Sequence, residues 1–230
     1  MTDGLVVAVM FPSGTAGYAY QGGYEPSGQS GIITRVGAAN DPPCGLVTKS
    51  HGRRIISIDD RPAAHVYNEW IGHVLDEKIA KGGNVLFDTT MFPLAIDVGS
   101  LDGVPHYRLI HPESITADGA LCTFAAVEER TRIHSMRGAK TRLIDRAGRV
   151  AREASALIPD GVSGVAGELV VYCAGCMAAV GDQMDNVMQE INKSLNGRPF
   201  LACFTFGEQG RLLKRNLHGN LMISAIAFGR

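Results

Sequence analysis

The sequence has little net charge, no long apolar run and an odd number of cysteines. Its 230 residues carry 22 basic and 23 acidic side chains, which gives a formal net charge of −1. A general nucleic-acid binder or a protein of anionic membranes needs a clustered excess of Lys and Arg, so this balance argues against both. The longest early apolar run, Leu5 to Phe11, is far shorter than the roughly 20 residues that a membrane-spanning helix needs.

The number of cysteines also argues against a secreted, disulfide-bonded protein. Five are present, at Cys44, Cys122, Cys173, Cys176 and Cys203, and an odd number in a chain of this length is not typical of a disulfide framework. An acidic residue, Asp3, precedes the first apolar run, where a secretory signal would carry positive charge. We therefore expect reduced thiols and a cytoplasmic location.

The familiar catalytic motifs are absent from the sequence. It has no G-x-x-x-x-G-K-[ST] loop, no G-x-G-x-x-G after a strand and no G-x-S-x-G elbow. Its seven histidines form no H-x-x-x-H or H-E-x-x-H pair. No catalytic residue is assigned from spacing, and we expect a binding protein rather than an enzyme.

The pattern of apolar residues predicts many short strands and a few helices. Hydrophobic residues make up 45% of the chain, and 28 glycines indicate many turns. Residues 12–31 are predicted to be a loop or an irregular hairpin. Strands are predicted at 5–11, 32–36, 45–49, 53–58, 106–111, 120–127, 132–136, 168–173, 200–206 and 221–228.

Three amphipathic segments predict the main helices. One follows the acidic pair at 59–60 and ends at Gly82, one covers 143–157, and one begins at an N-cap Asp182 and ends near Asn196. This order predicts an α/β or α+β fold, with mixed β-sheets and three main helices packed on their faces. Periodicity is weakest over 84–104, so we expect two regions, 1–104 and 105–230.

The richest candidate site is the run Cys173-Ala174-Gly175-Cys176 at the end of a predicted strand. Ligands often bind beyond the carboxyl ends of strands, and small residues let a ligand approach the backbone. The alternative is a turn of small residues that packing requires.

The Cys-x-x-Cys pair in this run is compatible with a redox dithiol or with half of a zinc site. A zinc site would need further ligands, and the imaginable set is Cys173, Cys176, Cys203 and His218. The predicted helix start at Asp182 lies beyond the pair, which weakens the redox interpretation. Two ordinary cysteines are the simplest alternative.

Two further polar clusters follow near the C-terminus. The first is the turn that contains Thr205, Gly207 and Glu208, and the second is His218-Gly-Asn220 at the entry to the last strand. An acid flanked by glycines suits a ligand ammonium or hydroxyl, so we assign Glu208 to that contact and the backbone near Gly175 to an anionic end. Solvated turns are the alternative.

These motifs, in this order, resemble the FIST (F-box and intracellular signal transduction) family. The segment with Asp59, Pro62, Ala63 and Tyr67 resembles a stretch of the family's N-terminal region. The family's C-terminal region carries a Cys-Ala-Gly-Arg strand end, a Thr-x-Gly-Glu turn and a final His-Asn entry. Here they resemble 173–175, 205–208 and 218–220. Cys176 stands where the family often has Arg, and the N-terminal region is short, as in a compact variant or a fragment.

The resemblance implies a sensory domain that binds a small ligand, with amino acids as the expected class, and acts through a separate signalling partner. A haem-based nitric-oxide sensor is the first alternative, since some bacterial members resemble such sensors. The others are a partner-docking module without a ligand, and a thiol or zinc site. We expect no resident cofactor, no nucleic-acid partner and no membrane partner.

Overall fold

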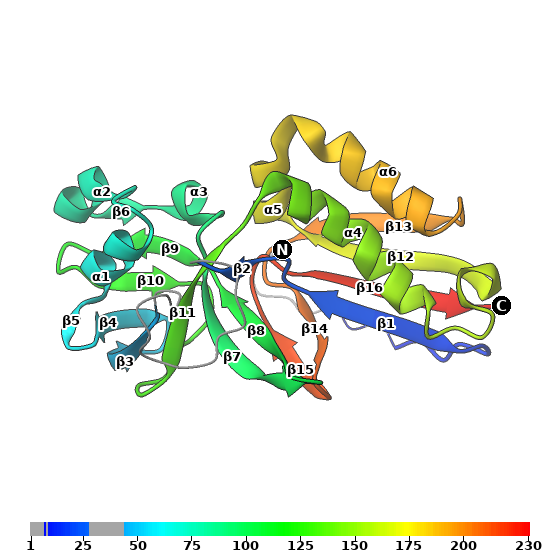
Figure 1. Ribbon diagram of the computed structural model, residues 1–230, viewed down its shortest axis with the longest axis horizontal. Coiled ribbons are helices and arrows are strands. Elements are labelled where there is room, and N and C mark those ends of the chain that lie inside the picture. The colour runs from blue at the N-terminus through cyan, green and yellow to red at the C-terminus, as the bar shows by residue number, and fades with distance from the viewer. Residues whose placement is uncertain (1–6, 8, 28–43) are drawn as a thin grey trace.

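Residues 7, 9–27 and 44–230 are described by a computed structural model, and their strands form two large sheets and one small one. Each large sheet lies at the centre of one lobe, and the lobes lie end to end along the long axis of the molecule (Figure 1). The predicted mixed fold of strands and helices is confirmed.

The first lobe contains a ten-stranded sheet in which every pairing is antiparallel. Eight strands follow one another across the sheet: β6 (Gly83–Asn84), β9 (Pro112–Ile115), β10 (Leu121–Thr123), β4 (Arg54–Ile58), β3 (Cys44–His51), β11 (Arg132–Arg137), β7 (Leu94–Leu101) and β8 (Val104–Ile110). Two short strands, β2 (Glu25–Pro26) and β5 (Arg61–Pro62), pair with β11 and β4. Helix α1 (Ala63–Trp70) contributes Val66 and Tyr67 to the apolar core of this lobe.

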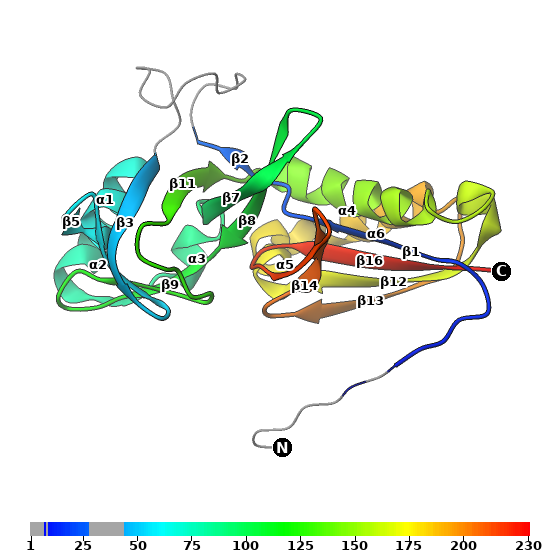
Figure 2. The same ribbon diagram turned by 90° about the horizontal axis from the view of Figure 1, so that it is seen from below.

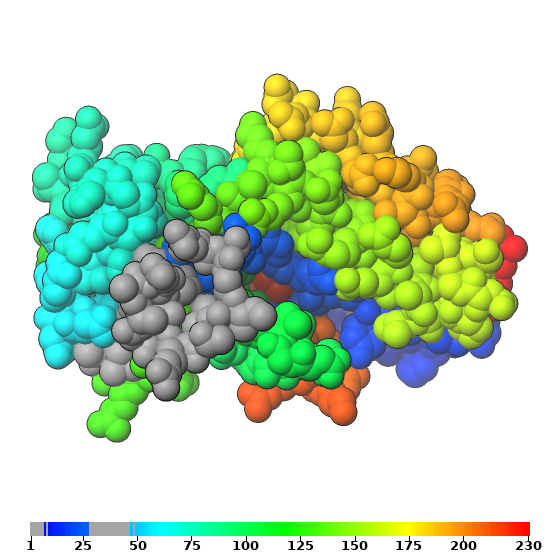
Figure 3. Space-filling model, viewed as in Figure 1, coloured from blue at the N-terminus to red at the C-terminus, as the bar shows by residue number. Residues whose placement is uncertain are grey.

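The second lobe contains a four-stranded sheet in the order β1 (Ala16–Gln21), β16 (Ile223–Gly229), β12 (Val165–Cys173) and β13 (Phe200–Thr205). Only β12 and β13 run parallel, so the sheet is mixed. Helices α4 (Lys140–Ser155) and α6 (Met184–Ser194) cover one face, and in the space-filling view they form one side of the lobe (Figures 2 and 3).

The predicted amphipathic helix over 143–157 corresponds to α4. Its residues Leu143, Ala147, Val150 and Ala154 recur at three- and four-residue spacing and are fully buried. Predicted as part of the same face, Leu157 lies beyond the end of the helix and is exposed. This helix therefore anchors the core of the second lobe.

The first predicted helix is not continuous, which corrects the sequence prediction. It is divided into α1 and α2 (Asp76–Lys81), and a short helix α3 (Leu86–Thr89) follows. Gly72 adopts a positive φ of 79°, and the amide of His73 donates to the carbonyl of Asn68. This is a Schellman end, so glycine stops the helix although the apolar spacing continues beyond it. The acidic pair at 59–60, which the sequence suggested as an N-cap, does not cap α1, whose N-cap residue is Pro62.

The helix predicted to start at Asp182 also begins elsewhere. Helix α5 (Ala174–Val180) follows β12 without a loop and has Cys173 as its N-cap residue. Asp182 lies in a single 3₁₀ turn (Gly181–Gln183) between α5 and α6. The predicted loop of small residues is therefore helical, and Cys176 lies in the first turn of that helix.

Several strand predictions also change. In the predicted strand 5–11, the described residues Val7 and 9–11 are exposed and lie outside any strand. The predicted loop 12–31 contains β1, and the prediction at 120–127 shortens to β10. The predicted strand at 32–36 lies outside the described residues, and β7 occupies part of the weakly periodic stretch 84–104.

The sheets divide the described chain near residue 138, and β1 joins the C-terminal sheet. The expected boundary after residue 104 lies within β8, and as a division between family regions it stays a prediction. A hairpin of β14 (Gln209–Leu212) and β15 (Arg215–His218) projects from the second lobe toward the β7–β8 hairpin (Figure 2). None of the helices in the described part of the chain is long and apolar enough to cross a membrane.

Candidate functional site

A cavity of about 240 Å³ lies at the junction of the two lobes. The first lobe contributes Arg53, His111 and Phe124 to its wall. The second contributes Cys173, Gly175, Phe206, Gly207, His218, Asn220 and Leu221. Ligand pockets are frequent where structural units meet, and sites for drug-sized molecules have volumes of about 300–1,000 Å³. This cavity therefore suits a smaller ligand.

One wall of the cavity is the transition from β12 to α5. A Cβ atom at Gly175 would lie 3.0 Å from Leu221 Cδ2 and 3.5 Å from Cys173 Sγ. A larger residue would have to displace Leu221 or fill the cavity. Glycine at this position therefore keeps the end of the strand open.

Asn220 joins the two lobes beside the cavity. Its side-chain oxygen accepts a hydrogen bond from the main-chain amide of His111 at 3.2 Å, and its main-chain amide donates to the carbonyl of Leu109 at 3.1 Å. Only 5% of Asn220 is exposed, and a buried side-chain amide needs such partners. We conclude that Asn220 fixes the geometry of the junction.

His111 is a buried neutral imidazole in the cavity wall. Burial lowers its pKa to about 4, although the hydrogen bond to the Leu86 carbonyl opposes that shift. Nε2 lies 3.0 Å from this carbonyl oxygen and must carry the proton, because a carbonyl can only accept. The neutral ring therefore keeps Nδ1 as an acceptor.

Glu208 is buried next to the cavity wall and does not line it. One carboxylate oxygen accepts from Thr205 Oγ1 at 3.1 Å and the other from the amide of Met222 at 3.3 Å. Its main-chain carbonyl accepts from Tyr20 Oη at 2.9 Å. Burial raises its pKa. Both oxygens have partners inside the protein, which gives Glu208 a structural role in holding the turn; the expected ligand contact stays a prediction.

The turn before Glu208 places His218 at the edge of the cavity. Gly207 has a φ of 84°, and a Cβ atom there would lie 2.8 Å from His218 Nε2. The positive φ therefore favours glycine, and a side chain there would also displace the imidazole of His218. His218 itself is exposed.

The charge of the cavity wall is positive. Arg53 is exposed and forms no ion pair within the described part of the chain, whereas the neighbouring Arg54 pairs with Asp118. Neither Asp nor Glu is among the described residues that line the cavity. The wall therefore favours an anionic ligand over a cationic one.

A second cluster lies beneath the cavity, around Cys176. The sulfur of Cys176 is 3.6 Å from Tyr24 Oη and 3.6 Å from the carbonyl oxygen of Leu221. The fully buried Arg146 donates from Nη1 to the same carbonyl at 2.9 Å. Its Nε and Nη2 atoms have no hydrogen-bond partner among the described residues. A guanidinium group thus lies beside Cys176, supplied by α4 rather than by the family's Cys-Ala-Gly-Arg position.

The structure brings together five of the predicted site residues: Cys173, Gly175, Gly207, His218 and Asn220. The other four, Ala174, Cys176, Thr205 and Glu208, adjoin the cavity in sequence but do not line it. Sequence reasoning missed five lining residues, Arg53, His111, Phe124, Phe206 and Leu221. Phe206 and Leu221 adjoin the predicted motifs at 205–208 and 218–220, whereas Arg53, His111 and Phe124 belong to no motif and are brought to the cavity by the fold alone.

The imagined zinc set is not assembled. Cys203 is exposed on β13 and pairs with Val171 rather than with Cys173. Over residues 7, 9–27 and 44–230, no three His, Cys, Asp or Glu side chains are grouped to hold a metal ion. The alternative of a zinc site at these four residues is therefore wrong.

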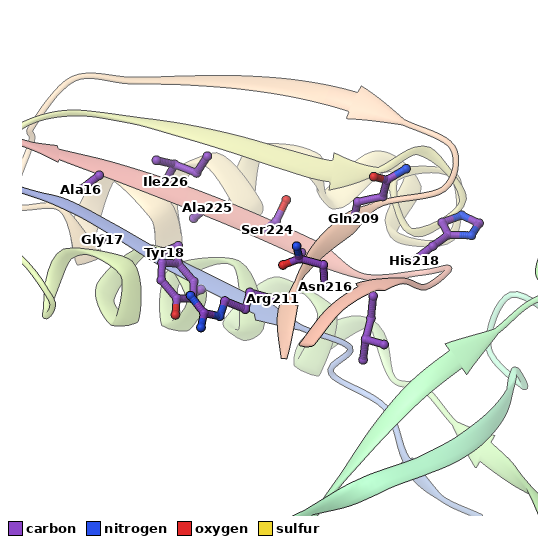
Figure 4. A pocket seen from close by; sticks show the side chains of 13 residues that line it. Ala16, Gly17, Tyr18, Gln209, Arg211, Asn216, His218, Ser224, Ala225 and Ile226 are labelled. Atoms are coloured by element: carbon purple, nitrogen blue, oxygen red, sulfur yellow. The ribbon is translucent and has the colours of Figure 1, made fainter. Parts of the chain in front are cut away.

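A larger open groove of about 770 Å³ borders the junction cavity. It lies between the uncovered face of the four-stranded sheet and the β14–β15 hairpin (Figure 4). Tyr18 and Arg211 lie next to each other there, with the guanidinium carbon 5.8 Å from the ring centroid. His218 lines both the groove and the cavity, so the two spaces are adjacent.

Fold and site together define a two-lobed mixed α/β domain with a small cavity at its junction. Comparison with family models identifies the family: the FIST C domain model matches residues 63–211, more than half of the chain, and the chain belongs to that family. The family is one of signal-transduction sensory domains. The match crosses the expected boundary at residue 104 and ends before His218. No curated protein and no solved structure matches the chain.

Proposed function

We propose that this FIST domain is a sensor that binds a small anionic organic ligand in the junction cavity and acts through a separate protein partner. The observation that carries the proposal is the composition of the cavity wall. It combines an exposed arginine, neutral polar groups and apolar side chains, and it contains no carboxylate among the described residues.

Each part of the wall has a role in this binding. Arg53 pairs with the ligand carboxylate, because a guanidinium matches a carboxylate with two parallel hydrogen bonds. Phe124, Phe206 and Leu221 contact the apolar part of the ligand. His111 supplies an acceptor from Nδ1 for a ligand N–H or O–H. An amino acid or another short carboxylic acid satisfies all three requirements, and no reaction is needed for the function.

The position of the cavity between the two lobes accounts for how ligand binding produces a signal. A ligand that touches residues of both lobes favours the relative placement in which all its contacts form, so binding shifts the population of lobe arrangements. Asn220 already bridges the lobes beside the cavity. The bound ligand therefore adds contacts between the lobes to those that Asn220 already makes.

For the output, the uncovered face of the four-stranded sheet is the surface we assign to the protein partner. Tyr18 and Leu201 are 44% and 68% exposed there, and Ile226 and Leu169 lie between them in register. A contiguous apolar row on a protein surface marks an interaction site. His218 connects this surface to the cavity, because it lines both.

The haem alternative is weaker at the cavity. A volume of 240 Å³ lies below the range for drug-sized ligands, and a porphyrin is a larger molecule. The buried His111 uses Nε2 on the Leu86 carbonyl. These residues do not fit a haem group, and a haem-binding form would have to use the groove and the exposed His218.

The test is a thermal-shift and calorimetric screen with free amino acids, short mono- and dicarboxylates, nucleotides and haemin. We expect stabilisation by one carboxylate class. Arg53→Gln should lower the affinity for that ligand about 10- to 100-fold, as expected when a charge-assisted hydrogen bond of about 1.5–3 kcal/mol is lost. Arg54→Gln is the matched control and should leave the affinity unchanged.

Three outcomes contradict the proposal. One is stabilisation only by cationic compounds, and another is equal weakening by Arg53→Gln and Arg54→Gln. The third is a response to haemin alone that His218→Ala abolishes, which would establish the haem alternative. Partner binding that no cavity variant or ligand alters would favour the docking-module alternative.

A further inference from the structure

Cys176 and Arg146 form a buried pair that the proposed ligand binding does not use. Neither side chain has any exposed surface, and both contact the carbonyl oxygen of Leu221. The guanidinium comes from the middle of α4, and the thiol comes from the first turn of α5. Two elements of the second lobe thus bring a cation and a thiol together in an apolar core.

A buried guanidinium needs an anion, because transfer of an unpaired charge into a protein interior is very costly. Arg146 forms no salt bridge with a carboxylate among the described residues. Its neighbours that can lose a proton are Cys176, Tyr24 and Tyr172. Of these, a thiol is the most acidic, so Cys176 is the anion.

The electrostatic balance around Cys176 agrees with this assignment. Burial alone would raise the pKa of the thiol, but the hydrogen bond with Cys173 and the charge of Arg146 outweigh burial and lower it to about 6. The pKa of Cys173 is raised, first by its hydrogen bond with Cys176 and then by burial. The two shifts have opposite directions, as expected when the Cys173 thiol donates to the Cys176 sulfur.

Cys173 gives this pair access to solvent. It is 4% exposed and lines the junction cavity, whereas Cys176 lies behind it. The two cysteines occupy the N-cap and third positions of α5, the spacing of a Cys-x-x-Cys disulfide. A small oxidant that enters the cavity therefore contacts Cys173 before Cys176, which lies behind Cys173.

We propose that Cys173 and Cys176 form a peroxide-reactive dithiol, in which oxidation to a disulfide removes the anionic partner of Arg146. The reactive site is distinct from the proposed carboxylate contact at Arg53, and it does not depend on the identity of the sensed ligand. Hydroperoxides small enough for the cavity are its substrate class.

The reaction balances with one hydroperoxide per dithiol. Cys173 passes its thiol proton to Cys176 and attacks a peroxide oxygen; an S–O bond forms, the O–O bond breaks and the leaving oxygen departs as water with the Cys176 proton. The Cys176 thiolate then attacks the Cys173 sulfur. An S–S bond forms, and the S–O bond breaks to release hydroxide, which takes one proton from solvent. Two electrons reduce hydrogen peroxide to two waters.

The experiment uses hydrogen peroxide and a background variant, Cys44→Ser/Cys122→Ser/Cys203→Ser, that keeps only the pair. We expect an internal disulfide, detected by mass spectrometry as the loss of two hydrogens. We also expect the melting temperature to fall by about 4 °C or more, because Arg146 loses its counter-charge. In the same background, Cys173→Ser should abolish the disulfide, because the buried Cys176 does not line the cavity that the oxidant enters.

Two measurements test the role of Arg146. In the background variant, the rate of alkylation of Cys173 by iodoacetamide should rise with a midpoint well below the ordinary thiol value of about 8.5, because loss of the shared proton from the pair, which Arg146 favours, makes Cys173 reactive. Arg146→Lys should retain the low midpoint, and Arg146→Gln should raise it by at least about one pH unit.

The proposal is overturned if the unmutated protein oxidises at the exposed Cys203 while Cys173 and Cys176 stay reduced. A midpoint near the ordinary thiol value in the background variant would also overturn it, even if Arg146→Gln fails to fold. Arg53→Gln should weaken carboxylate binding but leave disulfide formation unchanged. The dithiol proposal and the proposed function can therefore fail independently of each other.

Discussion

The two faces of the four-stranded sheet are made by the same strands but have different surroundings. On β12, Val170 and Tyr172 face α4 and α6 and are fully buried. Leu169 and Val171 alternate with them and face the uncovered side. There, Tyr18 on β1 and Leu201 on β13 remain exposed. One face of this sheet is thus a protein core, and the other is a surface.

This difference separates stability from binding. The covered face holds the apolar core together with a buried carboxyl group, Glu168, and the Arg146–Cys176 pair. Substitutions there change packing and the solvation of charge, which are the largest single-residue effects on stability. The uncovered face contributes little to the core. Its substitution should therefore have smaller effects on stability than substitution of the covered face.

The largest effect is expected where a charge lies within the covered face. Cys176→Ala leaves the guanidinium of Arg146 buried without an anion, so we expect a loss of about 3–5 kcal/mol in the free energy of unfolding. The double variant Arg146→Met/Cys176→Ala removes both charges and should recover most of that loss. Urea denaturation of the reduced proteins measures both values, and an equal loss in the single and double variants would contradict the ion pair.

A smaller effect on the same face depends on pH. Burial raises the pKa of Glu168 to about 7, although the hydrogen bond from Ser155 opposes the shift. The folded protein therefore keeps a proton between pH 4.5 and 7 that the unfolded chain releases. The free energy of unfolding should therefore be highest at low pH, where Glu168 is protonated in both states. It should fall by up to about 3 kcal/mol as the pH rises to 7.

Glu168→Gln should flatten this dependence, which denaturation midpoints at pH 5 and pH 7.5 would measure. Asp185→Asn, at an exposed position on α6, is the matched control and should leave the slope unchanged. A Glu168→Gln variant with the unmodified slope would show that another group is responsible.

The sequence predicted the elements of the covered face better than their ends. Apolar spacing located α4, because one side of a surface helix must be buried along its whole length. The same rule failed at Gly72, where a hydrogen-bonded helix end interrupts a continuing pattern. It failed again at α5, because the small residues of 174–179 form a helix as readily as a turn. Local end geometry competes with periodicity in both segments.

The cavity could be predicted only in part, for a topological reason. Cys173, Gly175, Gly207, His218 and Asn220 lie at or just beyond the ends of strands of the second lobe, where sequence patterns point to a site. His111 and Arg53 come from the other lobe and carry no local signal. Their positions depend on the bridge from Asn220 and on the packing of two cores, which no spacing along the chain encodes.

The smallest effect compares two adjacent residues of one strand. Val170→Ala removes two methyl groups from the fully buried side of β12 and should cost about 2 kcal/mol, since the packed core cannot close the space. Val171→Ala makes the same chemical change on the half-buried, uncovered side and should cost less than about 1 kcal/mol. The β-propensity of the strand changes equally in both variants, so the difference in their urea midpoints isolates burial. Equal costs would mean that the uncovered face is packed in solution, as it would be if a second molecule occupied it.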